Sequence, residues 1–125
     1  MTFNPKLDTS ISPFFNGKSQ HTIDLFNHFI DCYSKIGIIS LHPAKTMIGI
    51  ANSNKRIAYI TQIGKNFIHI VFPFKNSYDD NLCFQKIAKV PGKEIQYNHH
   101  FRMLLIEDIN SEVLKFMKLA YKNER

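Results

Sequence analysis

The feature that most constrains the fold of this chain is a change in the spacing of its apolar residues. In residues 19–36 they recur every three or four positions, as on one side of a helix: Ile23, Phe26, Ile30 and Tyr33. Ser19 is a suitable N-cap for this helix and Gly37 a suitable C-cap. Residues 38–72 instead hold short runs of β-branched and aromatic residues separated by Pro, Gly and Asn, which predicts antiparallel strands.

The remaining segments complete an expected order of helix, strands and helix. The central strands are predicted from Ile38 to Leu41, Lys45 to Ala51, Arg56 to Ile63 and Phe67 to Phe72. We expect a short helix over residues 82–90, then one or two strands over residues 95–106 with these side chains on one face: Phe101, Met103 and Leu105. Asn110 should cap a final helix whose inward side chains are Val113, Met117 and Ala120. The predicted fold class is α+β, a single antiparallel sheet packed by N- and C-terminal helices.

The length of the chain, 125 residues, is typical of one domain that buries a continuous core. We expect residues 1–13 to form an extended lead-in and residues 14–125 a single domain, with Phe14 and Phe15 fixing the lead-in to the core. No signal-peptide segment is recognisable, and no run approaches the roughly 18 apolar residues of a membrane span. These features predict a cytoplasmic protein without a membrane partner, and they leave its oligomeric state open.

The positive charge of the chain is concentrated in residues 35–75. The formal net charge is +6 with a pI near 9.4, and this segment holds six basic residues but no aspartate or glutamate. In an antiparallel meander the ends of neighbouring strands meet, so one end should gather Lys55, Arg56 and Lys75. The other end should gather Lys45 and Lys65. We hypothesise that the first cluster binds nucleic acid or another polyanion weakly and independently of sequence.

Two other interpretations of the charge stay open. In the first, the domain is a protein- or small-ligand-binding accessory module, and its charge serves only solubility. The final helix carries cations three and four positions apart, which form a secondary candidate surface: Lys115, Lys118, Lys122 and Arg125. The same spacing is typical of a solvated helix face, and the helix dipole favours cations near a C-terminus.

The histidines invite a metal-site hypothesis, which the pattern does not support. His99 and His100 are adjacent, and adjacent side chains on a strand point to opposite faces. The pair is therefore unsuited to one ion, even if His42 or His69 lay nearby. We expect one of the two adjacent histidines in the core and the other in solvent.

Catalysis is likewise not indicated by any local motif. Cys32 lies on the apolar side of the first helix, and Cys83 has no histidine or acid tied to it by a motif. The glycine-rich loops that cradle phosphates are absent from the sequence. A binding domain without catalytic residues, metal or cofactor is favoured over an enzyme, although a site assembled from scattered residues would leave no such motif.

Several short motifs extend across nearly the whole chain: Phe15-x-Gly17-Lys18, Pro43-x-Lys45, Ala58-x-Ile60, and His100-x-Arg102-x-Leu104 leading through Glu107-Asp108-Ile109 to Ala120-Tyr121. On these residues the chain resembles, from about Phe14 to Tyr121, the family catalogued as domain of unknown function 5655. The resemblance implies a fold similar to small proteins that include frataxin-like iron-chaperone relatives, and it carries over no catalytic residues. Iron handling is therefore a third interpretation, for which the sequence offers few carboxylate pairs: Asp79-Asp80 and Glu107-Asp108.

Overall fold

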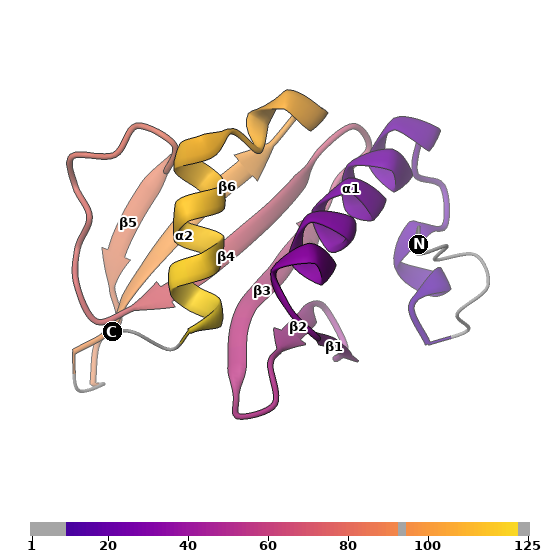
Figure 1. Cartoon of the computed structure of the whole chain (residues 1–125). Coiled ribbons are helices and arrows are strands. Elements are labelled where there is room, and N and C mark those ends of the chain that lie inside the picture. The colour runs from indigo at the N-terminus through magenta and orange to yellow at the C-terminus, as the bar shows by residue number, and fades with distance from the viewer. Residues whose placement is uncertain (1–9, 93–94, 123–125) are drawn as a thin grey trace.

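The computed structural model describes residues 10–92 and 95–122 of the chain, in which two helices pack on one sheet. The helices are α1 (Gln20–Ile36) and α2 (Ser111–Tyr121), with short 3₁₀ helices η1 (Ser12–Phe15) and η2 (Ile106–Asp108). The strands are β1 (Ser40–Pro43), β2 (Ile48–Ala51), β3 (Arg56–Ile63), β4 (Ile68–Phe74), β5 (Lys86–Lys89) and β6 (Tyr97–Met103). They form a six-stranded antiparallel sheet in the order β1-β2-β3-β4-β6-β5, and α1 and α2 lie on the same face of it (Figure 1). The predicted α+β fold is confirmed.

Both helices begin where the sequence predicts, because a side chain satisfies the first free amides at each N-terminus. The hydroxyl of Ser19 accepts a hydrogen bond from the backbone amide of Thr22 at 3.1 Å. The side-chain oxygen of Asn110 accepts one from the backbone amide of Val113 at 3.0 Å. At the other end of α1, Gly37 is the C-cap. No helix among the described residues is long and apolar enough to cross a membrane.

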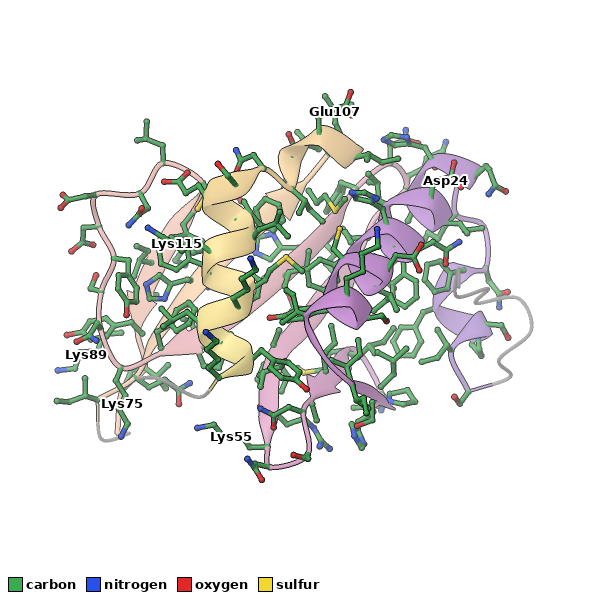
Figure 2. The ribbon with its side chains drawn as sticks, viewed as in Figure 1. Asp24, Lys55, Lys75, Lys89, Glu107 and Lys115 are labelled. Atoms are coloured by element: carbon green, nitrogen blue, oxygen red, sulfur yellow. The ribbon has the colours of Figure 1, made fainter. Side chains whose placement is uncertain are left out.

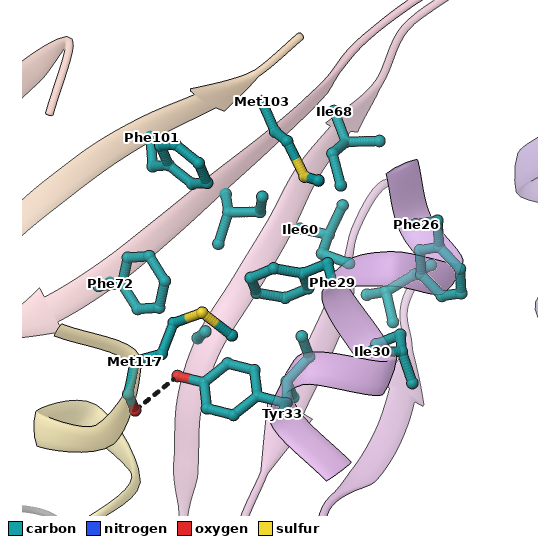
Figure 3. Packing of buried hydrophobic residues seen from close by; sticks show 14 of the residues in the cluster. Phe26, Phe29, Ile30, Tyr33, Ile60, Ile68, Phe72, Phe101, Met103 and Met117 are labelled. Carbon is teal, nitrogen blue, oxygen red and sulfur yellow. Dashed lines mark hydrogen bonds between the residues drawn. The ribbon is translucent and has the colours of Figure 1, made fainter. Parts of the chain in front are cut away.

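The hydrophobic core lies between the two helices and the face of the sheet that they cover (Figure 3). Phe26, Phe29 and Tyr33 project from α1 and are fully buried. The Tyr33 hydroxyl donates a hydrogen bond to the backbone carbonyl of Met117 in α2 at 3.1 Å, which joins the two helices inside the core. Ile11 is also fully buried, so the core includes a residue upstream of Phe14, where the sequence placed the start of the domain.

The edges of the central strands differ from the prediction because tight turns use some of the predicted strand residues. Lys45 lies in the turn between β1 and β2, where the amide of Ala44 donates to the carbonyl of Met47 at 2.8 Å. Strand β2 therefore begins at Ile48, three residues later than predicted, whereas β3 has the predicted bounds.

The predicted helix over residues 82–90 is wrong, since Lys86–Lys89 forms strand β5. This segment pairs antiparallel with β6, and the preceding amide of Gln85 donates to the carbonyl of His100 at 2.8 Å. Backbone pairing with a neighbouring strand thus overrides the local helical pattern. Within residues 95–106 a single strand forms, β6, which spans only Tyr97–Met103. Leu105 lies beyond its end and is 54% exposed, so it does not share the buried face of Phe101 and Met103.

Candidate functional site

The face of the sheet opposite α1 and α2, called the open face below, is the candidate site. Residues directly paired across antiparallel strands point to the same side, and side chains alternate along each strand. One row of paired residues therefore crosses all six strands on the open face: His42, Gly49, Tyr59, Val71, His100 and Lys86. Beside it, the pair of His69 and Arg102 also points to this side.

The open face carries basic side chains and no carboxylate from the strands. None of the six strands contains an aspartate or glutamate. Lys86 and Arg102 are exposed and belong to the open face by their pairing. Arg56 joins them, because its side chain lies across Gly49: a Cβ at Gly49 would come within 2.9 Å of the Arg56 Nε atom. With a residue larger than glycine at this position, the Arg56 side chain would have to shift away from β2.

A hollow of about 420 Å³ lies in the middle of the open face. Its lining comes from β3, β4 and β6 and from the residues that precede β2 and β6: Met47, Tyr59, Thr61, Val71, Gln96, Asn98 and His100. The lining combines an aromatic ring, apolar side chains, two amides, a hydroxyl and an imidazole. Such a mixture suits a flat ligand with polar edges.

Two histidines from neighbouring strands contact each other at the edge of this hollow. The Nε2 atom of His69 and the Nδ1 atom of His100 are 2.9 Å apart, so one ring donates a hydrogen bond to the other. Burial is the main cause that lowers the pKa of both rings. Repulsion from His100 and from Arg102 lowers the pKa of His69 further, and repulsion from Lys86 lowers the pKa of His100 further. The Nδ1 atom of His69 is buried without a hydrogen-bond partner among the described residues, which also disfavours a second proton on that ring. Both rings are therefore held neutral near pH 7.

His99 points to the opposite side from His100 and is 0% exposed, which confirms that one histidine of the adjacent pair lies in the core. Its Nε2 atom accepts a hydrogen bond from the amide of Tyr78 at 3.2 Å, so its proton lies on Nδ1, which donates to the carbonyl of Tyr97 at 2.9 Å. Burial lowers its pKa. His99 is a neutral structural residue, and no group of three or more His, Cys, Asp or Glu that could hold a metal occurs in the described part of the chain.

Arg102 extends the basic character of the open face toward the β3–β4 turn. Its guanidinium carbon lies 4.5 Å from the centre of the Phe67 ring, a cation–π contact. Stacking on Phe67 restricts the rotamers of a long side chain. The arginine is thereby held in a defined position while its side chain stays exposed.

The predicted cluster of Lys55, Arg56 and Lys75, called the rim below, divides into two groups at one end of the sheet. Lys55 lies in the β2–β3 turn and Arg56 is the first residue of β3, whereas Lys75 directly follows β4. Pairing of β3 with β4 ends at Tyr59 and Val71, but β4 continues to pair with β6 as far as Phe74 and Tyr97. Tyr97 also pairs with Lys89 of β5, so the end of β4 that precedes Lys75 is aligned with Lys89 and not with Arg56.

Figure 2 labels three lysines toward one end of the sheet, two carboxylates toward the other end, and Lys115 on α2 between them. Lys55, Lys75 and Lys89 lie in the lower left part of that view, and Asp24 and Glu107 lie toward its top. Lys89 extends the rim, and the sequence did not identify it, because it lies on the strand that was predicted as a helix.

The secondary candidate on α2 forms a separate surface. Lys115, Lys118 and Lys122 are exposed along the outer side of the helix, and Arg125 lies outside the described residues. These three lysines line an open groove of about 500 Å³ together with Tyr78, Ser111, Leu114, Phe116 and Leu119. The Nζ atom of Lys115 lies 4.8 Å from the centre of the Phe116 ring. The groove is therefore both apolar and basic.

Neither cysteine has the surroundings of a nucleophile. Cys32 and Cys83 are half-buried free thiols. Burial raises the pKa of Cys32, and burial together with the Glu112 carboxylate raises the pKa of Cys83 to about 12. Because the thiolate is the reactive form, both thiols are protonated and unreactive near pH 7.

Comparison of the chain with protein-family models, with curated proteins and with solved structures gave no match. The resemblance to the domain of unknown function 5655 family therefore stays a prediction, and the functional argument depends on the open face itself.

Proposed function

We propose that this protein binds nucleic acid or another polyanion weakly and without sequence specificity, through the open face and the rim of Lys55, Arg56 and Lys75. The observation that carries the proposal is the absence of any carboxylate from the six strands, together with the basic residues Lys86 and Arg102 on the open face. Arg56 joins the two surfaces, because it begins β3 at the rim and lies across Gly49 on the open face.

The mode of binding that this arrangement favours is contact with phosphate or sulfate groups. Lysine and arginine neutralise such groups and release their counterions, which gives affinity without reading base identity. A sheet face has no helix to enter the major groove, so base-specific recognition of a duplex is not expected. The charge of +6 for the chain supports association with an anionic partner. We place this activity in the cytoplasm, where both free cysteines would stay reduced.

The test compares three proteins by fluorescence anisotropy with a mixed-sequence oligonucleotide between about 20 and 200 mM salt. The first is the wild type, and the second is the triple variant Lys55→Gln, Arg56→Gln and Lys75→Gln. The matched control is Lys45→Gln with Lys65→Gln, which removes charges from the turns at the opposite end of the sheet.

We expect the triple variant to reduce the slope of log affinity against log salt by about 2, because each phosphate that a cation neutralises on a single strand adds roughly 0.7 to that slope. The control variant should keep a slope close to that of the wild type. The proposal is refuted if the wild type does not bind at low salt, or if the triple variant keeps the wild-type slope.

A second candidate function is protein binding, which the groove along α2 favours. Its Leu114 and Leu119 side chains are apolar while three lysines line the same groove, so its complement is an amphipathic segment with acidic residues. Changing Lys115, Lys118, Lys122 and Arg125 to Gln tests both uses of the helix. A fall in polyanion affinity would show that the α2 lysines form a secondary polyanion surface. Unchanged affinity would mean that these lysines only solvate the helix or contact an acidic protein partner.

Iron handling of the frataxin type is the third candidate and rests only on the family resemblance. Iron prefers carboxylate and imidazole ligands, and the described residues hold no cluster of three such groups. Addition of ferrous or ferric iron should leave the absorbance and NMR spectra of the protein unchanged. Specific, saturable spectral changes at one iron per chain would restore this candidate.

A further inference from the structure

We infer that the polyanion is single-stranded nucleic acid and that the hollow on the open face takes one unpaired base. This inference rests on the proposed function, because it identifies the ligand class of the same surface. Its basis is the chemistry of the hollow, since a contact surface for phosphate or sulfate alone would need only cations.

The hollow has the groups that a base requires. Tyr59 and His100 contribute flat rings to its lining, and Met47 and Val71 contribute apolar contact. Stacking on aromatic side chains is tolerant of sequence, because every base has a π-face. Tyr59 is half-buried, so packing restricts its motion while part of the ring stays accessible.

Two amides can meet the polar edge of the base without selecting its identity. Gln96 donates a hydrogen bond from Nε2 to the Oδ1 atom of Asn98 at 3.0 Å. This bond fixes the orientation of both amides and does not use the Asn98 nitrogen or the Gln96 oxygen. The hollow thus presents a donor and an acceptor side by side, together with the Thr61 hydroxyl, which both donates and accepts.

Basic residues lie on both sides of the hollow. Arg56 lies over β2, and Lys86 lies on β5 directly opposite His100. Four strand spacings of about 4.8 Å separate β2 from β5, or roughly 19 Å, a distance that a few nucleotides can span. Phosphates on either side of the stacked base would therefore meet Arg56 and Lys86, with Arg102 available beside them on β6.

The size of the hollow favours a single base over a duplex. Its volume of about 420 Å³ is at the lower end of the range for small-ligand sites. Bases in a duplex are stacked and paired, so their faces cannot reach Tyr59 unless the strands separate. Heparin and polyphosphate have no base, and they would use the cations without the hollow.

The experiment measures the dissociation constants of four probes at one low salt concentration: a mixed-sequence single-stranded oligonucleotide, the same strand with abasic sites, its duplex, and heparin. The variant is Tyr59→Ala, with Tyr59→Phe as the conservative replacement that keeps the ring. Gln62→Ala is the matched control, because Gln62 is an exposed residue of the same strand that does not line the hollow. Asn98→Ala tests the amide pair without changing an aromatic residue, and thermal melts confirm that each variant is folded.

We expect the wild type to bind the single strand at least fivefold more tightly than the abasic strand or the duplex. Tyr59→Ala should weaken single-strand binding by about five- to tenfold and leave heparin binding unchanged, and Tyr59→Phe and Gln62→Ala should bind as the wild type does. Equal affinity for the intact and abasic strands, or an equal effect of Tyr59→Ala on heparin, would overturn the inference while the proposed function stands. Failure of every probe to bind at low salt would overturn both.

Discussion

Truncation of Phe26 to alanine should unfold the protein at a markedly lower temperature. Phe26 is 0% exposed, and its ring packs edge-on against Phe15 with centroids 4.9 Å apart. Replacing a buried phenylalanine by alanine costs about 3–5 kcal/mol, which includes the removal of this aromatic pair. This is a large part of the roughly 5–15 kcal/mol that stabilises a typical domain. For a chain of this length the expected fall in melting temperature is about 10–20 °C.

The assay is thermal and urea unfolding of the Phe26→Ala variant, followed by far-UV circular dichroism. The matched control is Leu105→Ala, because Leu105 is half-exposed beyond the end of β6 and its truncation should change stability by less than about 0.5 kcal/mol. A melting temperature of Phe26→Ala equal to that of the wild type would show that the inward side of α1 does not hold the core together.

Buried groups give three further predictions. Burial lowers the pKa of His99 in the folded protein, so the unfolded chain binds a second proton on this ring more tightly than the folded chain does. The stability of the wild type should therefore fall as the pH drops below about 6.5, and the melting temperature of His99→Gln should depend less on pH over that range. Tyr33→Phe removes the hydrogen bond to the Met117 carbonyl and should cost about 1 kcal/mol in urea unfolding, while an unchanged midpoint would count against a role for this bond in joining the helices. Cys83 should react with iodoacetamide at pH 8 more slowly than free cysteine, because burial and Glu112 raise its pKa to about 12; faster reaction would revive it as a nucleophile.

The helices were predictable because their signals are local. Ser19 and Asn110 cap the helices that follow them, and the apolar spacing within each helix is independent of the rest of the chain. Strand β5 was not predictable in the same way. Its four residues, Lys86–Lys89, contain too short an apolar pattern to distinguish a strand from a helix, and their conformation depends on pairing with β6.

The candidate site was predictable only in part, for a related reason. The acid-free segment of residues 35–75 covers β1 to β4 and includes Arg56 and Tyr59. The other half of the open face comes from β5 and β6, and β6 lies next to β4 although β5 intervenes in the sequence. This crossover brings His100 against His69, a contact between strands that no local spacing indicates.

The same crossover explains the position of Lys75. A regular meander predicts Lys75 beside Arg56. The end of β4 pairs with β6 and not with β3, however, so the strand end that precedes Lys75 is aligned with Lys89 of β5. The triple variant tests whether a ligand nevertheless contacts both groups of the rim. A further variant, Lys75→Gln with Lys89→Gln, would measure the contribution of the second group by itself.

Binding on the open face is measured most simply by an NMR titration of ¹⁵N-labelled protein with a mixed-sequence single-stranded oligonucleotide at low salt. Binding on the open face predicts that the largest amide shift changes occur in β3, β4 and β6, around Tyr59, His100 and Arg102, and that they decrease as salt is added. Largest changes along α2, or no changes at all at low salt, would contradict the assignment of the open face as the binding surface.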